Sequence, residues 1–131
     1  MNTAPSPLRI LLVDDSRALR YTMRTVLKTF SDLRVVGKTE NGKLAIQMAR
    51  YLSPDLVLMD IEMPVMDGAE ATRQILAENS NLKVIGYSAA AQPSQLRKIM
   101  DAGAVAFLNK SVSADQLVQG IRNATVGVQA P

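Results

Sequence analysis

The sequence predicts an α/β fold in which five strands alternate with five helices. Residues 9–13 and 56–59 are nearly continuous apolar runs, which is typical of strands buried on both faces of a parallel sheet. Shorter strands are expected at residues 33–37, 84–87 and 104–108. Between the strands, apolar residues recur at helical spacing. This alternation indicates right-handed crossovers, with helices covering both faces of the sheet.

Capping and breaking residues delimit the predicted helices. The first follows an N-cap at Ser16, and the third is expected over residues 69–77. The other signals are a turn at Asn41-Gly42 and a stop at Ser53-Pro54 for the second helix, a start at Pro93 and a C-terminal Gly103 for the fourth, and a capping box of Ser113 and Gln116 for the fifth.

Length and composition describe one globular domain. The chain has 131 residues, of which 47% are hydrophobic and 21% are charged. It contains no Cys and no His, so thiol catalysis, disulfides, His-ligated zinc and a histidine phosphodonor are excluded. The remaining chemistry is that of carboxylates, hydroxyls, lysines and hard metal ions.

Nothing in the charge or hydropathy pattern indicates nucleic acid or a membrane as partner. The formal charge of +3 is modest, and no apolar run approaches the ~18–20 residues of a membrane span. The N-terminus lacks a signal-peptide core, so we expect a cytoplasmic protein. Residues 1–8 and 126–131 are expected to be short tails, the latter being either a natural end or a truncated linker, with the domain over 9–125.

Polar side chains follow four of the predicted strands. They are Asp14 and Asp15 after the first, Asp60 after the third, Ser88 after the fourth and Lys110 after the fifth. Binding sites of open α/β sheets form at the carboxyl ends of the strands, so these side chains are expected to meet there. Crowded carboxylates require a cation, and Mg²⁺ prefers oxygen ligands. Together with a lysine and a hydroxyl, they indicate metal-assisted phosphoryl transfer onto an Asp side chain.

Each of these residues alone has an ordinary explanation. Adjacent acids at a strand end are often a solvated loop, a lone serine is often a cap, and a lone lysine usually lies on the surface. Only the joint arrangement favours a site.

The ordered motifs resemble those of a response-regulator receiver domain, the phosphoacceptor module of two-component signalling. The matching segments are residues 11–16 (LLVDDS), 55–64 (DLVLMDIEMP), 66–68 (MDG), 88–90 (SAA), 102–104 (AGA) and 107–110 (FLNK). The resemblance extends from about residue 9 to 125. It implies a flavodoxin-like, doubly wound (βα)5 fold with a five-stranded parallel sheet in the order 2-1-3-4-5.

The resemblance also implies roles for individual residues. Asp60 would accept a phosphoryl group from a phosphohistidine of a sensor kinase or a histidine phosphotransfer protein. The Mg²⁺ ligands would be Asp15, Asp60 and the backbone carbonyl of Glu62, with Asp14 acting through water. Lys110 and Ser88 would contact the phosphoryl group, and Ser88 and Phe107 would move with the switch.

The function implied is a signalling switch rather than an enzyme, which assists its own phosphorylation and dephosphorylation. It would control an output partner or an attached output domain through the surface around strands 4–5 and helices 4–5, with a homodimer possible. An alternative function remains open, a receiver-like module that binds proteins without phosphorylation. A phosphohydrolase of the haloacid-dehalogenase type would need a second Asp at the position of Glu62.

Three departures from the family pattern carry expectations. Ser111 replaces the usual Pro after the active-site lysine, so we expect a trans peptide bond and a rearranged loop. Phe107 has no hydroxyl, so packing alone would drive its rotation. Glu62 and Ala90 occupy positions that tune hydrolysis of the phosphoryl-aspartate. Because Ala90 cannot orient a water, we expect slow self-dephosphorylation.

Overall fold

A computed structural model describes residues 6–63 and 65–125 as a single sheet flanked by helices. The strands are β1 (Leu8–Val13), β2 (Leu33–Thr39), β3 (Leu56–Asp60), β4 (Lys83–Ser88) and β5 (Ala106–Asn109). The helices are α1 (Arg17–Lys28), α2 (Gly42–Leu52), α3 (Gly68–Glu78), α4 (Pro93–Asp101) and α5 (Ala114–Ala124). Of the predicted tails, residues 1–5 and 126–131 lie outside the described residues.

The sheet has five strands in the order β2-β1-β3-β4-β5, and every neighbouring pair is parallel. This confirms the predicted fold class and strand order. The order reverses between β1 and β3, where the connections after the two strands leave toward opposite faces of the sheet. Such a reversal opens a crevice at the carboxyl ends of the strands.

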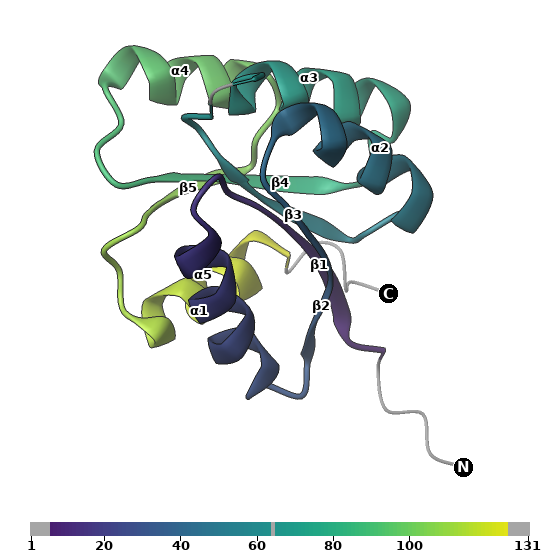
Figure 1. Ribbon diagram of the computed structural model, residues 1–131, viewed down its shortest axis with the longest axis vertical. Helices are drawn as coiled ribbons and strands as arrows, with labels where there is room; N and C mark the ends of the chain where they lie inside the picture. The colour runs from purple at the N-terminus through teal and green to yellow at the C-terminus, as the bar shows by residue number, and fades with distance from the viewer. Residues whose placement is uncertain (1–5, 64, 126–131) are drawn as a thin grey trace.

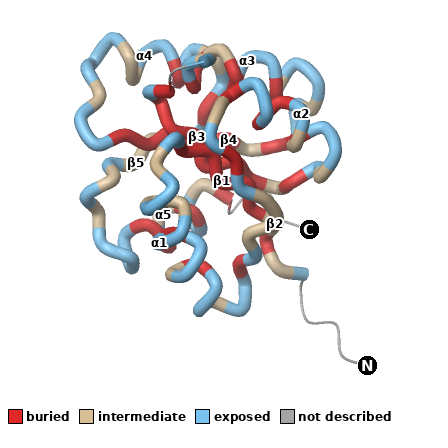
Figure 2. The backbone as a smooth tube through the Cα atoms, viewed as in Figure 1, coloured by how far each residue is buried: buried red, intermediate tan, exposed pale blue. Residues whose placement is uncertain are grey.

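Three helices cover one face of the sheet and two cover the other. In Figure 1, α2, α3 and α4 lie together above the sheet, whereas α1 and α5 lie below it. The apolar residues of β1 alternate between these layers, because Leu11 and Val13 pack toward α2–α4 while Ile10 and Leu12 pack toward α1 and α5. Burial on both faces explains the continuous apolar runs, and Figure 2 shows it concentrated in the central strands.

The predicted helix signals are found at the helix ends. Ser16 caps α1 by accepting a hydrogen bond from the Leu19 amide, and Ser113 and Gln116 form a capping box at α5. Gly103 follows the C-cap of α4 with φ +118°, a conformation that other residues rarely adopt. Among the described residues, no helix is both long and apolar enough to cross a membrane.

The last two strands differ from prediction at their ends. The predicted start of β5 at residue 104 is wrong, because the Ala104 amide still bonds to the Ile99 carbonyl at the end of α4, and the strand begins at Ala106. β4 runs on to Ser88 and passes through Gly86 without a break. A Cβ at position 86 would lie 2.9 Å from Ile99 Cδ1, so this glycine gives α4 room to pack on the sheet.

Candidate functional site

Three carboxylates meet at the carboxyl edge of the sheet. Asp14 and Asp15 follow β1, and Asp60 is the last residue of β3. Each offers one oxygen, and these oxygens lie within 4.8 Å of one another. We call these residues the carboxylate cluster. The structure thus brings together the acids that the sequence placed on two separate strands.

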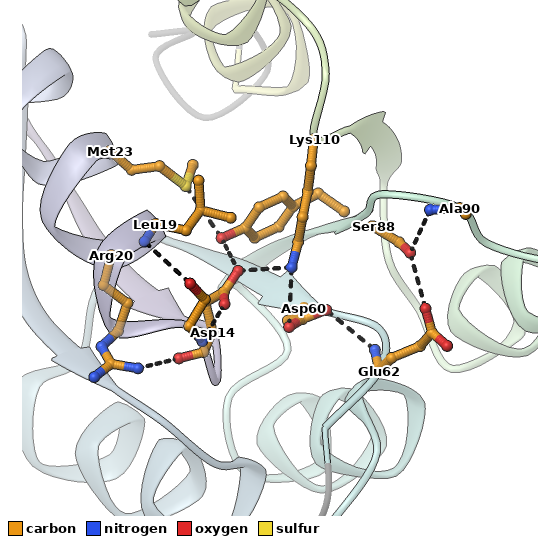
Figure 3. A network of polar contacts seen from close by, with 11 residues as sticks. Asp14, Leu19, Arg20, Met23, Asp60, Glu62, Ser88, Ala90 and Lys110 are labelled. Carbon is orange, nitrogen blue, oxygen red and sulfur yellow. Dashed lines mark hydrogen bonds and ion pairs between the residues drawn. The ribbon is translucent and has the colours of Figure 1, made fainter.

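Lys110 supplies the cation that faces this cluster. Its Nζ lies 2.8 Å from Asp14 Oδ2 and 3.1 Å from Asp60 Oδ2, and Figure 3 shows it between the two side chains. The Lys110 amide donates to the Ser88 carbonyl at 3.0 Å, which continues the pairing of β4 and β5 by one residue. Burial alone would lower the pKa of Lys110. The hydrogen bond to Asp14 and the charges of Asp60 and Asp14 outweigh it and raise the pKa.

Asp14 has no exposed surface, and both of its carboxylate oxygens have partners. Oδ1 accepts the Ser16 amide at 2.6 Å, and Oδ2 accepts the Tyr87 hydroxyl at 2.7 Å in addition to Lys110. The Asp14 backbone carbonyl also accepts a hydrogen bond from Arg20. A buried charge is tolerated only when it is paired and hydrogen-bonded, as it is here.

Sequence reasoning missed Tyr87, which contributes directly to this network. The residue is 2% exposed on β4, next to Ser88. A tyrosine inside an apolar strand needs a partner for its hydroxyl, and this was the available signal. The strand alternation sends its side chain toward α1 and α5, on the side where Asp14 and Met23 lie.

Asp60 is 2% exposed, and its environment favours the neutral acid more than usual. Burial and the nearby charge of Asp14 raise its pKa to about 6, against the opposing effects of Lys110 and the Glu62 amide. That amide donates to Asp60 Oδ1 at 3.1 Å. A cation bound next to Asp60 would therefore stabilise its ionised form.

The other side of the site is open to solvent. Asp15 and Glu62 are exposed and border a surface pocket together with Ile61, Met63, Asp67 and Gln95. Ser88, 1% exposed, donates to Glu62 Oε1 at 3.3 Å and accepts the Ala90 amide at 3.3 Å, as Figure 3 shows. The Ser88 hydroxyl thus lies beside the carboxylate cluster, and its hydrogen bond to Glu62 is long and therefore weak.

Gly68 is a second residue whose part in the site was not predicted. A Cβ at this position would lie 2.3 Å from the Asp60 carbonyl oxygen, so only glycine lets α3 begin against the end of β3. The Gly68 amide donates to the Ile61 carbonyl at 3.1 Å, and Asp67 caps the helix. The sequence Asp67-Gly68 contained this signal as a cap followed by a glycine.

The loop after Lys110 is held by a residue that sequence reasoning did not single out. Asn109 Oδ1 accepts both the amide and the hydroxyl of Ser111, at 2.8 Å and 2.7 Å. The described residues contain no cis peptide bond, as expected without proline at this position. Lys110 reaches the cluster from this loop. Phe107 is half-buried and packs against the core on the α2–α4 side, and its part in a switch stays a prediction.

The chemistry of the donors decides what this site can bind. Three carboxylates at one point form an all-oxygen donor set of the kind that hard divalent cations prefer, and His and Cys are absent from the chain. The cluster therefore fits such a cation. Asp60 would remain a nucleophile there, with a lysine and a hydroxyl beside it to contact an anion.

Comparison with known proteins agrees with this site. The family model for the response regulator receiver domain matches residues 10–122. The response regulator protein VraR of Staphylococcus saprophyticus is 37% identical over 116 residues, which cover 88% of this chain and 56% of VraR. The transcriptional regulatory protein LiaR of Bacillus subtilis is 35% identical over 120 residues, which cover 92% of this chain and 57% of LiaR.

Solved structures agree as well. The signal receiver domain of the response regulator NarL from Mycobacterium tuberculosis superposes with a TM-score of 0.88 at 26% identity, covering 94% of this chain and 99% of that one. The chain spans little more than half the length of the curated relatives it matches. With a family model over most of its length, and with its fold and acidic site in agreement, the chain belongs to the response regulator receiver domain family.

Proposed function

We propose that this chain is a phosphorylation-dependent switch in which Asp60 accepts a phosphoryl group from a phosphohistidine. The donor would be a sensor histidine kinase or a histidine phosphotransfer protein. One observation carries the proposal. Asp60 is a buried carboxylate that lies next to the carboxylates of Asp14 and Asp15 and forms an ion pair with the Lys110 ammonium. Burying several charges together has no structural advantage comparable to its cost, so a function is the better explanation.

The transfer would proceed by direct attack of the carboxylate. An Asp60 oxygen forms a bond to phosphorus, the phosphorus–nitrogen bond to the donor imidazole breaks, and that nitrogen keeps the electron pair. Mg²⁺, when bound, would offset charge on the phosphoryl oxygens. Asp15, Asp60 and the Glu62 carbonyl would hold it, and Asp14 would act through water. Lys110 would pair with one phosphoryl oxygen.

The switch would follow from new contacts of Ser88 and Lys110. Ser88 would exchange its 3.3 Å hydrogen bond with Glu62 for one to the phosphoryl group, and Phe107 would follow. Moving an equilibrium from 1:99 to 99:1 needs about 5.5 kcal/mol. One charge-assisted hydrogen bond contributes about 1.5–3 kcal/mol, so both residues are required.

The proposed output involves a partner or an attached domain. Response regulators work with sensor kinases and output partners, and the relatives above are longer regulators. We propose that the surface around β4, β5, α4 and α5 transmits the change to an output partner or an attached output domain. A homodimer is one form such an output could take.

Intact-mass measurement after incubation with acetyl phosphate and Mg²⁺ tests this function. We expect a phosphoryl adduct on the wild-type chain, none on Asp60→Asn, and none on the wild type when EDTA replaces Mg²⁺. If Mg²⁺ binds but no adduct forms, the chain is instead a module that binds proteins without phosphorylation. An adduct on Asp60→Asn would assign the acceptor role to a different residue.

A further inference from the structure

We propose that Tyr87 is a positioning residue for phosphoryl transfer: its hydroxyl holds Asp14, keeps that carboxylate from ligating the metal directly, and frees Lys110 to move to the phosphoryl group. This inference rests on the proposed function and concerns a residue outside the motifs that define the site. Its starting point is that one carboxylate oxygen, Asp14 Oδ2, accepts both the Tyr87 hydroxyl and the Lys110 ammonium.

The geometry brings Tyr87 into contact with both charged partners. Its hydroxyl oxygen is 2.7 Å from Asp14 Oδ2, and the Lys110 Nζ lies 2.8 Å from the same oxygen. The Lys110 Nζ also lies 5.0 Å from the centroid of the Tyr87 ring, within the range of a cation–π contact. The hydroxyl is 3.1 Å from Met23 Sδ, a weaker acceptor than a carboxylate. The tyrosine therefore donates its proton to Asp14.

This hydrogen bond leaves Asp14 with little capacity for a metal. Its other oxygen accepts the Ser16 amide at 2.6 Å, so three donors occupy the carboxylate. Asp15 differs, because it is exposed beside the open pocket. Tyr87 thus separates the two acids into one that is held by the protein and one that is available for direct ligation.

The Tyr87 ring is buried in the core but borders a cavity on one side. A largely apolar pocket between α1 and α5 lies against it, with Met23 and Leu117 among its lining residues. The bond to Asp14 is the stronger of the two polar contacts that the hydroxyl makes, the other being with Met23 Sδ. A phenylalanine would fill the same space without that contact.

The hydroxyl matters most when Lys110 moves. If the ammonium turns from Asp14 toward a phosphoryl group on Asp60, Asp14 loses one of its three donors while having no exposed surface. A buried carboxylate that loses its partners is strongly destabilised. Tyr87 remains as a donor to the same oxygen, which lowers the free-energy cost of releasing Lys110.

The test compares Tyr87→Phe with Tyr51→Phe, which removes a hydroxyl from a side chain that is 88% exposed. In Tyr87→Phe, Asp14 Oδ2 gains a free site for the metal, and it loses the donor that would remain when Lys110 moves to the phosphoryl group. We expect Mg²⁺ to bind about three- to tenfold more tightly by calorimetry, while phosphorylation by acetyl phosphate at saturating Mg²⁺ slows by a similar factor. A purely structural role would weaken both together, so opposite changes identify positioning.

A spectroscopic readout uses the wild-type hydroxyl itself. The chain has three tyrosines and no tryptophan, so the Tyr21→Phe, Tyr51→Phe double variant leaves Tyr87 as the single reporter. We expect its near-ultraviolet difference spectrum and its emission to change on Mg²⁺ titration, because the metal alters the charge that Asp14 presents to the hydroxyl. No change in the spectrum would contradict the inference.

The remaining outcomes separate this inference from the proposed function. Tyr87→Phe values within twofold of the Tyr51→Phe control for both Mg²⁺ affinity and rate would overturn it, as would parallel losses of both. If the wild-type chain accepts no phosphoryl group, the proposed function fails. The Mg²⁺ affinity and the Tyr87 spectrum then still decide whether Tyr87 holds Asp14 away from the metal.

Discussion

One side of the carboxylate cluster is closed and the other is open. On the closed side Asp14 is fully buried, and its carboxylate is held by a backbone amide, the Tyr87 hydroxyl and Lys110. On the open side Asp15 and Glu62 are exposed beside a surface pocket. Asp60 lies between them and contacts Lys110 on one side and the Glu62 amide on the other.

This difference separates two tasks that adjacent residues of similar chemistry perform. The closed side keeps charges in place at the expense of stability, because every group in it must have its partners. The open side leaves ligands free for an incoming ion or phosphodonor. Substitutions on the closed side should therefore change folding stability, and those on the open side should change binding.

The largest effect is expected for Lys110→Ala on the closed side. This change leaves Asp14 and Asp60 without their shared cation, and breaking such a pair destabilises by about 2–3 kcal/mol when the cation is partly buried. Chemical denaturation in EDTA measures the loss. Adding Mg²⁺ should recover part of it, because a bound cation replaces the missing charge and stabilises the folded state.

Arg50→Ala is the matched control for Lys110→Ala. Arg50 pairs with Glu78 at 2.7 Å, but both side chains are well exposed, so little change in stability is expected. If the two variants lose the same stability, or if Mg²⁺ restores none of the Lys110→Ala loss, the closed side does not hold its charges as described.

Asp15→Asn should change Mg²⁺ binding and leave folding stability nearly unchanged. Because Asp15 is exposed, replacing its carboxylate should leave the midpoint of unfolding nearly unchanged in EDTA. Loss of a charged ligand should weaken Mg²⁺ binding by about tenfold or more, or about 1.4 kcal/mol. Calorimetric titration measures this, with Asp67→Asn as the control, since Asp67 lines the same pocket but is not in the carboxylate cluster. Equal weakening of Mg²⁺ binding in both variants would show that loss of negative charge, rather than loss of a ligand, causes the effect.

The raised pKa of Asp60 predicts how stability depends on pH in the metal-free protein. Burial raises this pKa from 3.8 to about 6, so the folded state binds the proton more tightly than the unfolded state. The stabilisation is fully present below pH 4 and is lost as pH rises through about 6. Asp60→Asn does not titrate there, and at pH 7 it should be more stable than the wild type by about 3 kcal/mol.

Thermal unfolding in EDTA from pH 4.5 to 7.5 tests this expectation. The difference in stability between Asp60→Asn and the wild type should grow from pH 4.5 to about 6 and then level off, while effects of other acids cancel. A difference that is constant with pH would show that Asp60 titrates in its ordinary range. Such a result would mean that Asp60 behaves like the solvent-exposed acids of the open side.

The sequence predicted the fold and the open side of the site better than the closed side. Continuous apolar runs identify buried parallel strands, and the acids at their ends are visible in the sequence. Tyr87 was missed because a single tyrosine in a strand belongs to no sequence pattern from which the partner of its hydroxyl could be predicted. Its contact with Asp14 joins residues 73 positions apart, and it depends on the register of β4 against β3 and of β3 against β1.

Glycines and the Ser111 loop show the same limit. The reason for Gly68 is a 2.3 Å approach to the Asp60 carbonyl, which depends on how α3 packs on β3 rather than on local propensity. The sequence predicted that Ser111 would alter the loop, but it did not indicate that Asn109 holds it. Contacts between elements decide these details, whereas caps and apolar periods are local and were correctly identified at Ser16 and Ser113.

The smallest effect is expected for Ala90→Glu on the open side, where it would change the lifetime of the phosphoryl group. Ala90 is exposed, and its amide donates to Ser88 at 3.3 Å, so a longer side chain at this position lies next to the proposed phosphoryl contact. A carboxylate there can orient a water for attack on phosphorus, which a methyl group cannot do. We expect decay of the adduct to quicken by a few-fold, less than about tenfold or 1.4 kcal/mol.

Intact mass followed after removal of acetyl phosphate measures the decay, and Ala89→Glu adds the same charge at the neighbouring exposed position. Equal acceleration in both variants would trace the effect to charge alone, and an unchanged rate in Ala90→Glu would contradict the expectation that Ala90 makes self-dephosphorylation slow.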